Sequence, residues 1–174
     1  MAQRHPEIVK SLVLIRVTGG DTAVRRLPSK YYQVFIDAAR KGGMKAVCET
    51  PDYQERIKAR PDNEAILMRM DPQDFIRVQE NWLKIFTSGS SYPVMGVNEE
   101  TLKAIQVPVL VIPGNDKTHA SVNGIAAAKL MPHAQLFQLP IEDQDIDIIS
   151  FGEWAHLEPA IATRVLTFLK GVTS

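Results

Sequence analysis

The chain has 174 residues, 45% of them hydrophobic, which suffices for one ordinary hydrophobic core. Its 20 basic and 20 acidic side chains cancel, which argues against a binding surface for nucleic acid or an anionic membrane. The single cysteine, Cys48, excludes an internal disulfide framework. No apolar run approaches the roughly 20 residues that span a bilayer, and the first residues do not resemble a signal peptide, so we expect a cytoplasmic protein.

Three short apolar segments rich in β-branched residues are the predicted strands: 11–17, 107–112 and 134–139. The first two are almost continuously apolar, as is typical of parallel strands covered on both faces, and the third alternates. A helix is predicted over 120–131 with an apolar stripe of Val122, Ile125, Ala126 and Leu130. A last helix carries Ile161, Val165, Phe168 and Leu169 and is expected to end at Gly171. This alternation indicates an α/β fold.

Between Pro28 and Lys103 the helical patterns continue without a convincing strand, which predicts a helical insertion. One amphipathic helix, with an apolar face of Tyr32, Phe35, Ile36 and Ala39, is expected to end at Gly42-Gly43. A second begins at Pro72 with Asp71 as its N-cap, and 88–93 is interpreted as a closing loop. The predicted domains are a core fragment over 1–27, the insertion over 28–104, and the C-terminal part of the core over 105–174.

Three strands separated by so long an insertion make a thin sheet. A buried-type parallel strand needs neighbours on both edges, yet the segment 11–17 follows the start of the chain with no other strand before it. We therefore expect further strands from sequence that this chain does not contain. An alternative is pairing with another chain that completes the sheet.

Two sequence segments resemble the α/β-hydrolase family, and their order along the chain extends the resemblance over nearly its whole length. The first is Ala2-x-x-His5-Pro6-Glu7-x-Val9-x-Ser11-Leu-Val-Leu14, similar to the entry into the sixth core strand. The second is Ile105-x-Val107-Pro-Val-Leu-Val-Ile-Pro-Gly114-Asn-Asp116, similar to the strand and turn that present the family's catalytic acid. The resemblance implies a partial α/β-hydrolase fold: a remnant of the parallel sheet interrupted by a helical cap.

The resemblance also implies a Ser, Asp or Cys nucleophile on a Gly-x-Ser-x-Gly-like elbow, followed along the chain by an acid and a histidine. No Gly-x-Ser-x-Gly motif occurs in the 174 residues, so the nucleophile and the oxyanion hole are expected upstream. We expect the chain alone to be inactive. By resemblance, the complete enzyme hydrolyses an ester, amide, carbon–carbon or similar bond of a small apolar substrate.

Asp116 is the candidate catalytic acid, since it follows a predicted strand at the end where open α/β sheets place their sites. The alternative is a turn residue that caps the next helix. The family's histidine is expected near Gly152, but Glu153 occupies the aligned position, and His156 is the candidate base. The alternative for His156 is a residue at the start of a helix, packed beside the core.

His119 and Trp82 are candidate substrate-binding residues, one near Asp116 and the other in the cap beside Phe86, Met68 and Met70. Local structure and packing between cap helices are the respective alternatives. No histidine spacing is typical of a metal site and no glycine-rich phosphate loop is present, so no cofactor is expected. A noncatalytic binding protein on the same scaffold is the alternative function, because Glu153 stands where the base is expected.

Overall fold

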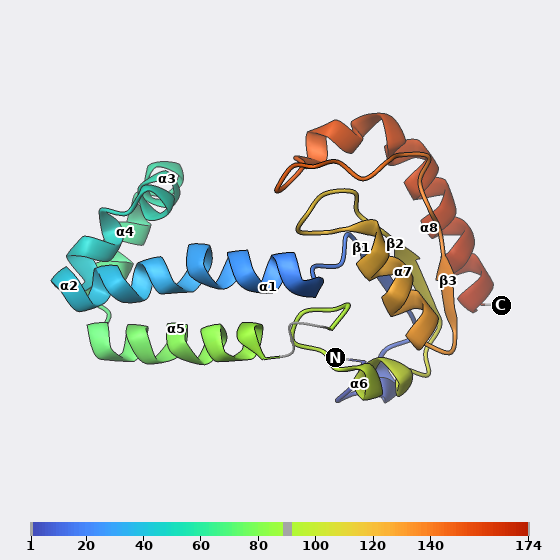
Figure 1. Ribbon diagram of the computed structural model, residues 1–174, viewed down its shortest axis with the longest axis horizontal. Coiled ribbons are helices and arrows are strands. Elements are labelled where there is room, and N and C mark those ends of the chain that lie inside the picture. Colours follow the sequence, from blue (N-terminus) through green and yellow to red (C-terminus); the bar gives the residue numbers. More distant parts are fainter. Residues whose placement is uncertain (1, 89–91, 174) are drawn as a thin grey trace. The chain divides into compact units, whose positions relative to one another are not determined.

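The computed structural model describes residues 2–88 and 92–173 (Figure 1). Short 3₁₀ or π-helical segments are η1 (Pro6–Ile8), η2 (Ser29–Gln33) and η3 (Phe151–Leu157). The strands are β1 (Leu12–Ile15), β2 (Val109–Ile112) and β3 (Ala134–Leu136). The α-helices are α1 (Gly20–Pro28), α2 (Val34–Cys48), α3 (Pro51–Ala59), α4 (Asp62–Met68), α5 (Pro72–Thr87), α6 (Glu99–Lys103), α7 (Ser121–Leu130) and α8 (Glu158–Thr173).

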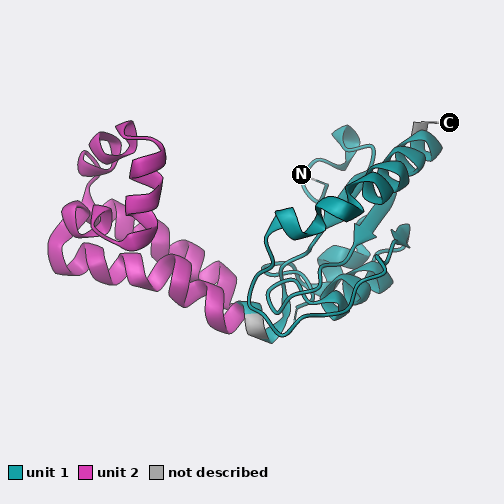
Figure 2. Ribbon diagram, turned by 90° about the horizontal axis from the view of Figure 1, so that it is seen from above, with its two compact units in different colours: residues 1–23, 89–174 teal, residues 24–88 magenta. Residues whose placement is uncertain are grey.

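Two compact units share these elements (Figure 2). The sheet unit comprises residues 1–23 and 89–174, and the helical unit comprises residues 24–88, so the division falls within α1. Residues 92–104 belong to the sheet unit, whereas the helical insertion was expected to extend to residue 104. The physical reason is that Leu102 of α6 is buried against Val109 and Val111 of β2.

The three predicted strands are confirmed as one parallel sheet of order β1-β2-β3. Ile15 pairs with Ile112, so β1 and β2 end at the same level. Side chains of the sheet alternate between two clusters. One, with η3 and α8, comprises Leu110, Ile112, Leu139, Ile149, Trp154, Leu157 and Phe168. The other, with α6 and α7, comprises Leu102, Val109, Val111, Ala127 and Met131.

The two core helices differ in detail from the predictions. The apolar stripe predicted for α7 is wrong at Val122, which is 62% exposed, because α7 buries the face with Gly124 and Ala127 instead. A side chain at Gly124 would crowd Pro113, so the glycine lets the helix approach the chain after β2 closely. The predicted end at Gly171 is also wrong, since α8 continues to Thr173.

The helical unit has its own core between α2, α3, α4 and α5. It comprises Phe35, Ile36, Ala39, Met44, Val47, Cys48, Leu67, Phe75 and Ile76. The predicted N-cap of α5 is confirmed, because the Asp71 side chain accepts hydrogen bonds from the backbone N–H groups of Gln73 and Asp74. At Gly42 and Gly43 the backbone is non-helical, as the sequence predicts, although helix resumes and α2 continues to Cys48.

Of the loop expected over 88–93, residues 89–91 lie outside the described residues. Within the part of the chain that the structure describes, no helix has the length and apolar character needed to cross a membrane.

Candidate functional site

Asp116 lies four residues beyond β2, at the end of the sheet where parallel strands present their following loops. The residue is 1% exposed. Its Oδ1 accepts hydrogen bonds from the backbone N–H groups of Thr118 at 3.0 Å and His119 at 2.8 Å, and its Oδ2 accepts one from Ile149 at 3.0 Å. The carboxylate therefore both closes its own turn and fastens the segment that precedes η3.

Arg16 faces the same carboxylate from the end of β1. Its Nη2 donates to Asp116 Oδ2 at 2.7 Å and to the carbonyl oxygen of Ile149 at 2.6 Å, and the two ionic side chains are 3% and 0% exposed. The guanidinium carbon lies 4.6 Å from the ring centre of Phe151 and 5.3 Å from that of Trp154. Because β1 and β2 are parallel and in register, Arg16 and Asp116, which follow these strands, lie at the same end of the sheet and contact each other.

The pKa of Asp116 results from opposing influences. Burial of the carboxyl group raises its pKa, because it disfavours the charged form. Hydrogen bonds from the Ile149 backbone and from the backbone and ring of His119 lower it, as does the charge of His119, and the net direction is downward from the ordinary value of 3.8. Asp116 is therefore an ionised acceptor at neutral pH.

His119 is held against Asp116 by its ring as well as its backbone. Its Nδ1 lies 2.9 Å from Oδ1 and 3.0 Å from Oδ2, and its side chain is 17% exposed. A side chain at Gly114 would overlap the carbonyl oxygen and Cβ of His119, so the turn closes only over a glycine. An aspartate in this position can fix the tautomer and orientation of an imidazole.

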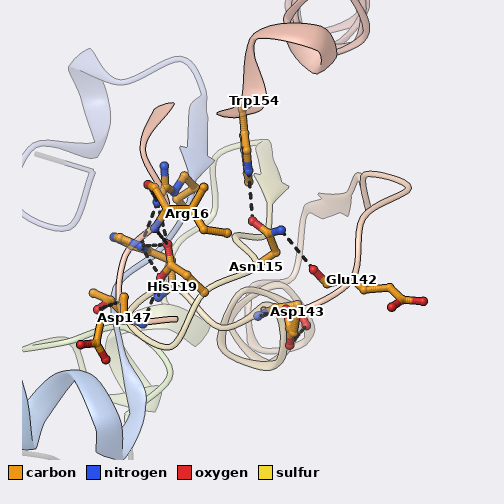
Figure 3. A network of polar contacts seen from close by, with 11 residues as sticks. Arg16, Asn115, His119, Glu142, Asp143, Asp147 and Trp154 are labelled. Atoms are coloured by element: carbon orange, nitrogen blue, oxygen red, sulfur yellow. Dashed lines mark hydrogen bonds and ion pairs between the residues drawn. The ribbon is translucent and has the colours of Figure 1, made fainter. Parts of the chain in front are cut away.

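The acidic loop after β3 docks onto this turn through backbone hydrogen bonds. Lys117 and Thr118 donate to the carbonyl oxygens of Ile146 and Asp147, and Gln144 donates to that of Asn115. In a second line of contacts, Trp154 donates to the Asn115 side chain at 3.0 Å, and Asn115 donates to the Glu142 carbonyl at 3.1 Å (Figure 3). These contacts hold the loop residues 142–147 against the turn that carries Asp116.

His156 is placed differently from what the resemblance implies. It lies exposed in η3 and, within residues 2–88 and 92–173, its side chain makes no hydrogen bond or ion pair. Glu153, at the position aligned with the family's histidine, is also exposed in η3. The structure thus brings Asp116 together with His119 and Arg16, and it joins neither His156 nor Glu153 to Asp116 by a hydrogen bond.

Trp82 belongs to the helical unit. It is 49% exposed on α5, with its ring centre 6.2 Å from that of Phe86. Met68 and Met70, on and after α4, are also exposed. An apolar groove of about 490 Å³ in this unit is lined by Tyr53, Leu67, Met70, Asp71, Asp74, Phe75, Val78 and Gln79. Trp82 is not among its lining residues.

Arg16 is the site residue that the sequence reasoning missed. Its signal is a single charged side chain in the apolar segment 11–17. In the structure β1 ends at Ile15, one residue before Arg16. Arg16 takes a left-handed backbone conformation with φ 55°, which turns its side chain out of the line of the strand. Among the described residues, no three His, Cys, Asp or Glu side chains converge on a position that could hold a metal ion.

The sequence matches no protein-family model and no curated protein, whereas solved structures are similar to it. A putative non-heme bromoperoxidase, BpoC, from Mycobacterium tuberculosis is 21% identical, with a TM-score of 0.54, over 99% of this chain and 62% of its own. A hydrolase from Pseudomonas aeruginosa is 20% identical, with a TM-score of 0.50, over 97% and 58%. The enol-lactonase from Burkholderia xenovorans is 18% identical, with a TM-score of 0.47, over 97% and 59%.

The first two of these likenesses establish the fold, which is a partial α/β-hydrolase fold. The chain spans 58–62% of the length of the three solved structures.

Proposed function

We propose that this chain supplies the acid-bearing part of a hydrolytic active site, acting on an ester, amide, carbon–carbon or similar bond of a small apolar molecule. The observation that carries the proposal is Asp116, a buried carboxylate at the end of β2 whose pKa is lowered and which holds an imidazole at 2.9 Å. Such a pair can orient a general base beside a nucleophile. The fold adds support, since a hydrolase is among its structural neighbours.

The nucleophile and the oxyanion hole belong, in this proposal, to sequence outside the 174 residues. The order of the family's catalytic residues places the elbow before the acid, and no Gly-x-Ser-x-Gly occurs here. The chain alone therefore lacks the group that would attack a carbonyl carbon.

The test uses the protein expressed from its coding sequence together with whatever precedes residue 1, assayed on a panel of small apolar esters and amides. Asp116→Asn should lower kcat by about 10⁴-fold, because the amide no longer fixes the required tautomer. The matched control is Asp145→Asn, since the Asp145 side chain is 94% exposed. Unchanged turnover in Asp116→Asn removes Asp116 from the mechanism.

A noncatalytic binding protein on this scaffold is the second candidate function. It is favoured by the Arg16 contact, because a permanent cation on Oδ2 offsets the negative charge that would stabilise an imidazolium. An upstream elbow without Ser, Asp or Cys supports this candidate, and an elbow with one of them supports the enzyme.

Pairing with a strand from outside the chain is part of the same proposal. Among the described residues β1 is paired on one edge only, by β2, and an unpaired edge is a template for another strand. The mass of the 174-residue protein in solution tests this. A stable, well-folded monomer of this length contradicts the need for a further strand.

A further inference from the structure

Among the described residues, His119 is the only histidine that contacts Asp116. Its Nδ1 lies within hydrogen-bonding distance of both carboxylate oxygens, whereas His156 is exposed and has no bond to Asp116. We infer that His119, and not a histidine of the loop after β3, is the imidazole that Asp116 orients and the general base of the site. This inference rests on the proposed hydrolytic function.

The proton positions follow from the partners. An ionised carboxylate is an acceptor only, so the nitrogen that it contacts must carry the ring proton. Nδ1 of His119 therefore donates to Asp116, and in the neutral ring Nε2 holds the lone pair. Within residues 2–88 and 92–173, Nε2 has no hydrogen-bond partner. It is the nitrogen that is free to accept a proton.

The ring is held by the turn itself. The backbone N–H of His119 donates to Asp116 Oδ1 at 2.8 Å and to the Asp116 carbonyl oxygen at 3.1 Å. With the ring Nδ1, two groups of His119 thus contact Asp116. Gly114 leaves the space that this turn needs. A base held in this way loses little conformational entropy on reaching the transition state, which lowers the barrier.

Arg16 defines how Asp116 acts. The guanidinium lies 2.7 Å from Oδ2, and its Nη2 is 3.4 Å from Nδ1 of His119. Since both nitrogens are donors, the ring proton points to the carboxylate rather than to Arg16. Asp116, already neutralised by a cation, contributes the tautomer and the orientation of the ring more than its charge.

The reaction step balances within this geometry. Nε2 of His119 takes the proton of a hydroxyl nucleophile or of water while that oxygen bonds to the carbonyl carbon, and the carbonyl π pair moves to its oxygen. When the bond to the leaving oxygen or nitrogen breaks, Nε2 returns the proton to that atom, and the ring is neutral again. Where the nucleophile is a hydroxyl, water then repeats both steps on the acyl intermediate: Nε2 takes a proton from water as its oxygen bonds to the acyl carbon, and returns it to the hydroxyl oxygen as the acyl–oxygen bond breaks. By either route one water is consumed for each ester or amide bond cleaved.

The first experiment needs only the 174-residue chain. Ring ¹⁵N spectra of the neutral histidines should show His119 as the Nδ1–H tautomer, and Asp116→Asn should remove this preference. His156, which is exposed, is the internal control and should show the Nε2–H form that dominates in solvent. Wild-type His119 with its proton on Nε2 overturns the inference, and this measurement depends on no variant that could fail to fold.

The second experiment uses the protein extended upstream of residue 1. His119→Ala should lower kcat by about 10²- to 10⁴-fold, the range for loss of a general base, and added imidazole should restore part of it. His156→Ala should leave turnover unchanged. Turnover that survives His119→Ala but is lost in His156→Ala overturns the inference. Absence of hydrolysis in the wild type with every substrate contradicts the proposed function instead.

Discussion

Arg16 and Asp116 form an ion pair whose two side chains are almost completely removed from water. Such a pair is costly to break by deleting one partner, because the remaining charge stays buried without compensation. Arg16→Met keeps the apolar stem near the rings of Phe151 and Trp154 but removes the cation. We expect it to lower the free energy of unfolding by about 3–5 kcal/mol, measured by urea denaturation.

The matched control is Arg77→Met, which removes an arginine from an ion pair with Asp74 at 2.8 Å. There the side chains are 66% and 71% exposed, so the expected loss is at most about 1 kcal/mol. Equal effects of the two substitutions would contradict a structural role for the buried pair.

The lowered pKa of Asp116 predicts a pH dependence of stability. A carboxyl group whose folded-state pKa lies below its unfolded value binds fewer protons when folded, so its stabilisation is complete above the unfolded pKa. That contribution is lost as the pH falls below the ordinary value of 3.8 and through the folded-state pKa. Urea denaturation of the wild type between about pH 6 and pH 2 should show this loss.

The control for that pH dependence is Asp116→Asn, which has no titrating group at this position. Its free energy of unfolding should be lower near neutral pH and should change less over the acidic range than that of the wild type. Parallel pH profiles for the two proteins would show that Asp116 is not the group responsible.

The position of Asp116 beyond the end of β2 was predictable from the sequence and its contacts less so, while its catalytic role stays a prediction. A polar residue just after a buried parallel strand lies at the sheet end that carries function, which is a property of the fold class. Arg16 escaped prediction because its role depends on a left-handed backbone and on a partner 100 residues away. His119 was predicted near Asp116, but its ring contact depends on the closure of one turn.

At the scale of elements, the turn between β2 and α7 depends on Gly114. A methyl group there would overlap the His119 backbone, which cannot move without breaking its hydrogen bonds to Asp116. We expect Gly114→Ala to destabilise the chain by at least about 1 kcal/mol and to weaken the Asp116–His119 contact. Urea denaturation and the ring ¹⁵N signals of His119 measure the two effects.

Gly171→Ala is the control for that substitution. Gly171 lies within α8, and a methyl group there would meet nothing within 4 Å. Since alanine favours helix over glycine, stability should rise by about 0.5–1 kcal/mol. A loss at Gly171 comparable with that at Gly114 would mean that crowding at the turn is not the cause.

Elements with a strong local signal were predicted best. The strands coincide with runs of β-branched residues. The start of α5 is marked by Asp71-Pro72, and the hydrogen bonds of the Asp71 cap involve only the first turn of that helix. The apolar stripe predicted for α7 was wrong at Val122, because the apolar residues of this helix lie all around it. The close contact of Gly124 with Pro113 determines which face of α7 is buried. A search for periodic hydrophobic residues does not detect a contact made by a glycine.

At the scale of the molecule, the helical unit and the sheet unit differ in how they complete their cores. The core cluster of the helical unit lies wholly within residues 24–88, whereas β1 of the sheet unit has one strand neighbour among the described residues. A segment with its own core can fold independently, although a unit this small has a narrow margin.

We therefore expect residues 24–88, expressed alone, to be helical by far-ultraviolet circular dichroism and to unfold cooperatively with temperature. Phe35 is 2% exposed and packs edge-on against Tyr53 at 4.8 Å between ring centres, so Phe35→Ala should cost about 3–5 kcal/mol and abolish the transition. The neighbouring Val34 is 45% exposed, and Val34→Ala should leave it intact. A wild-type segment without a cooperative transition would show that its core needs the rest of the chain.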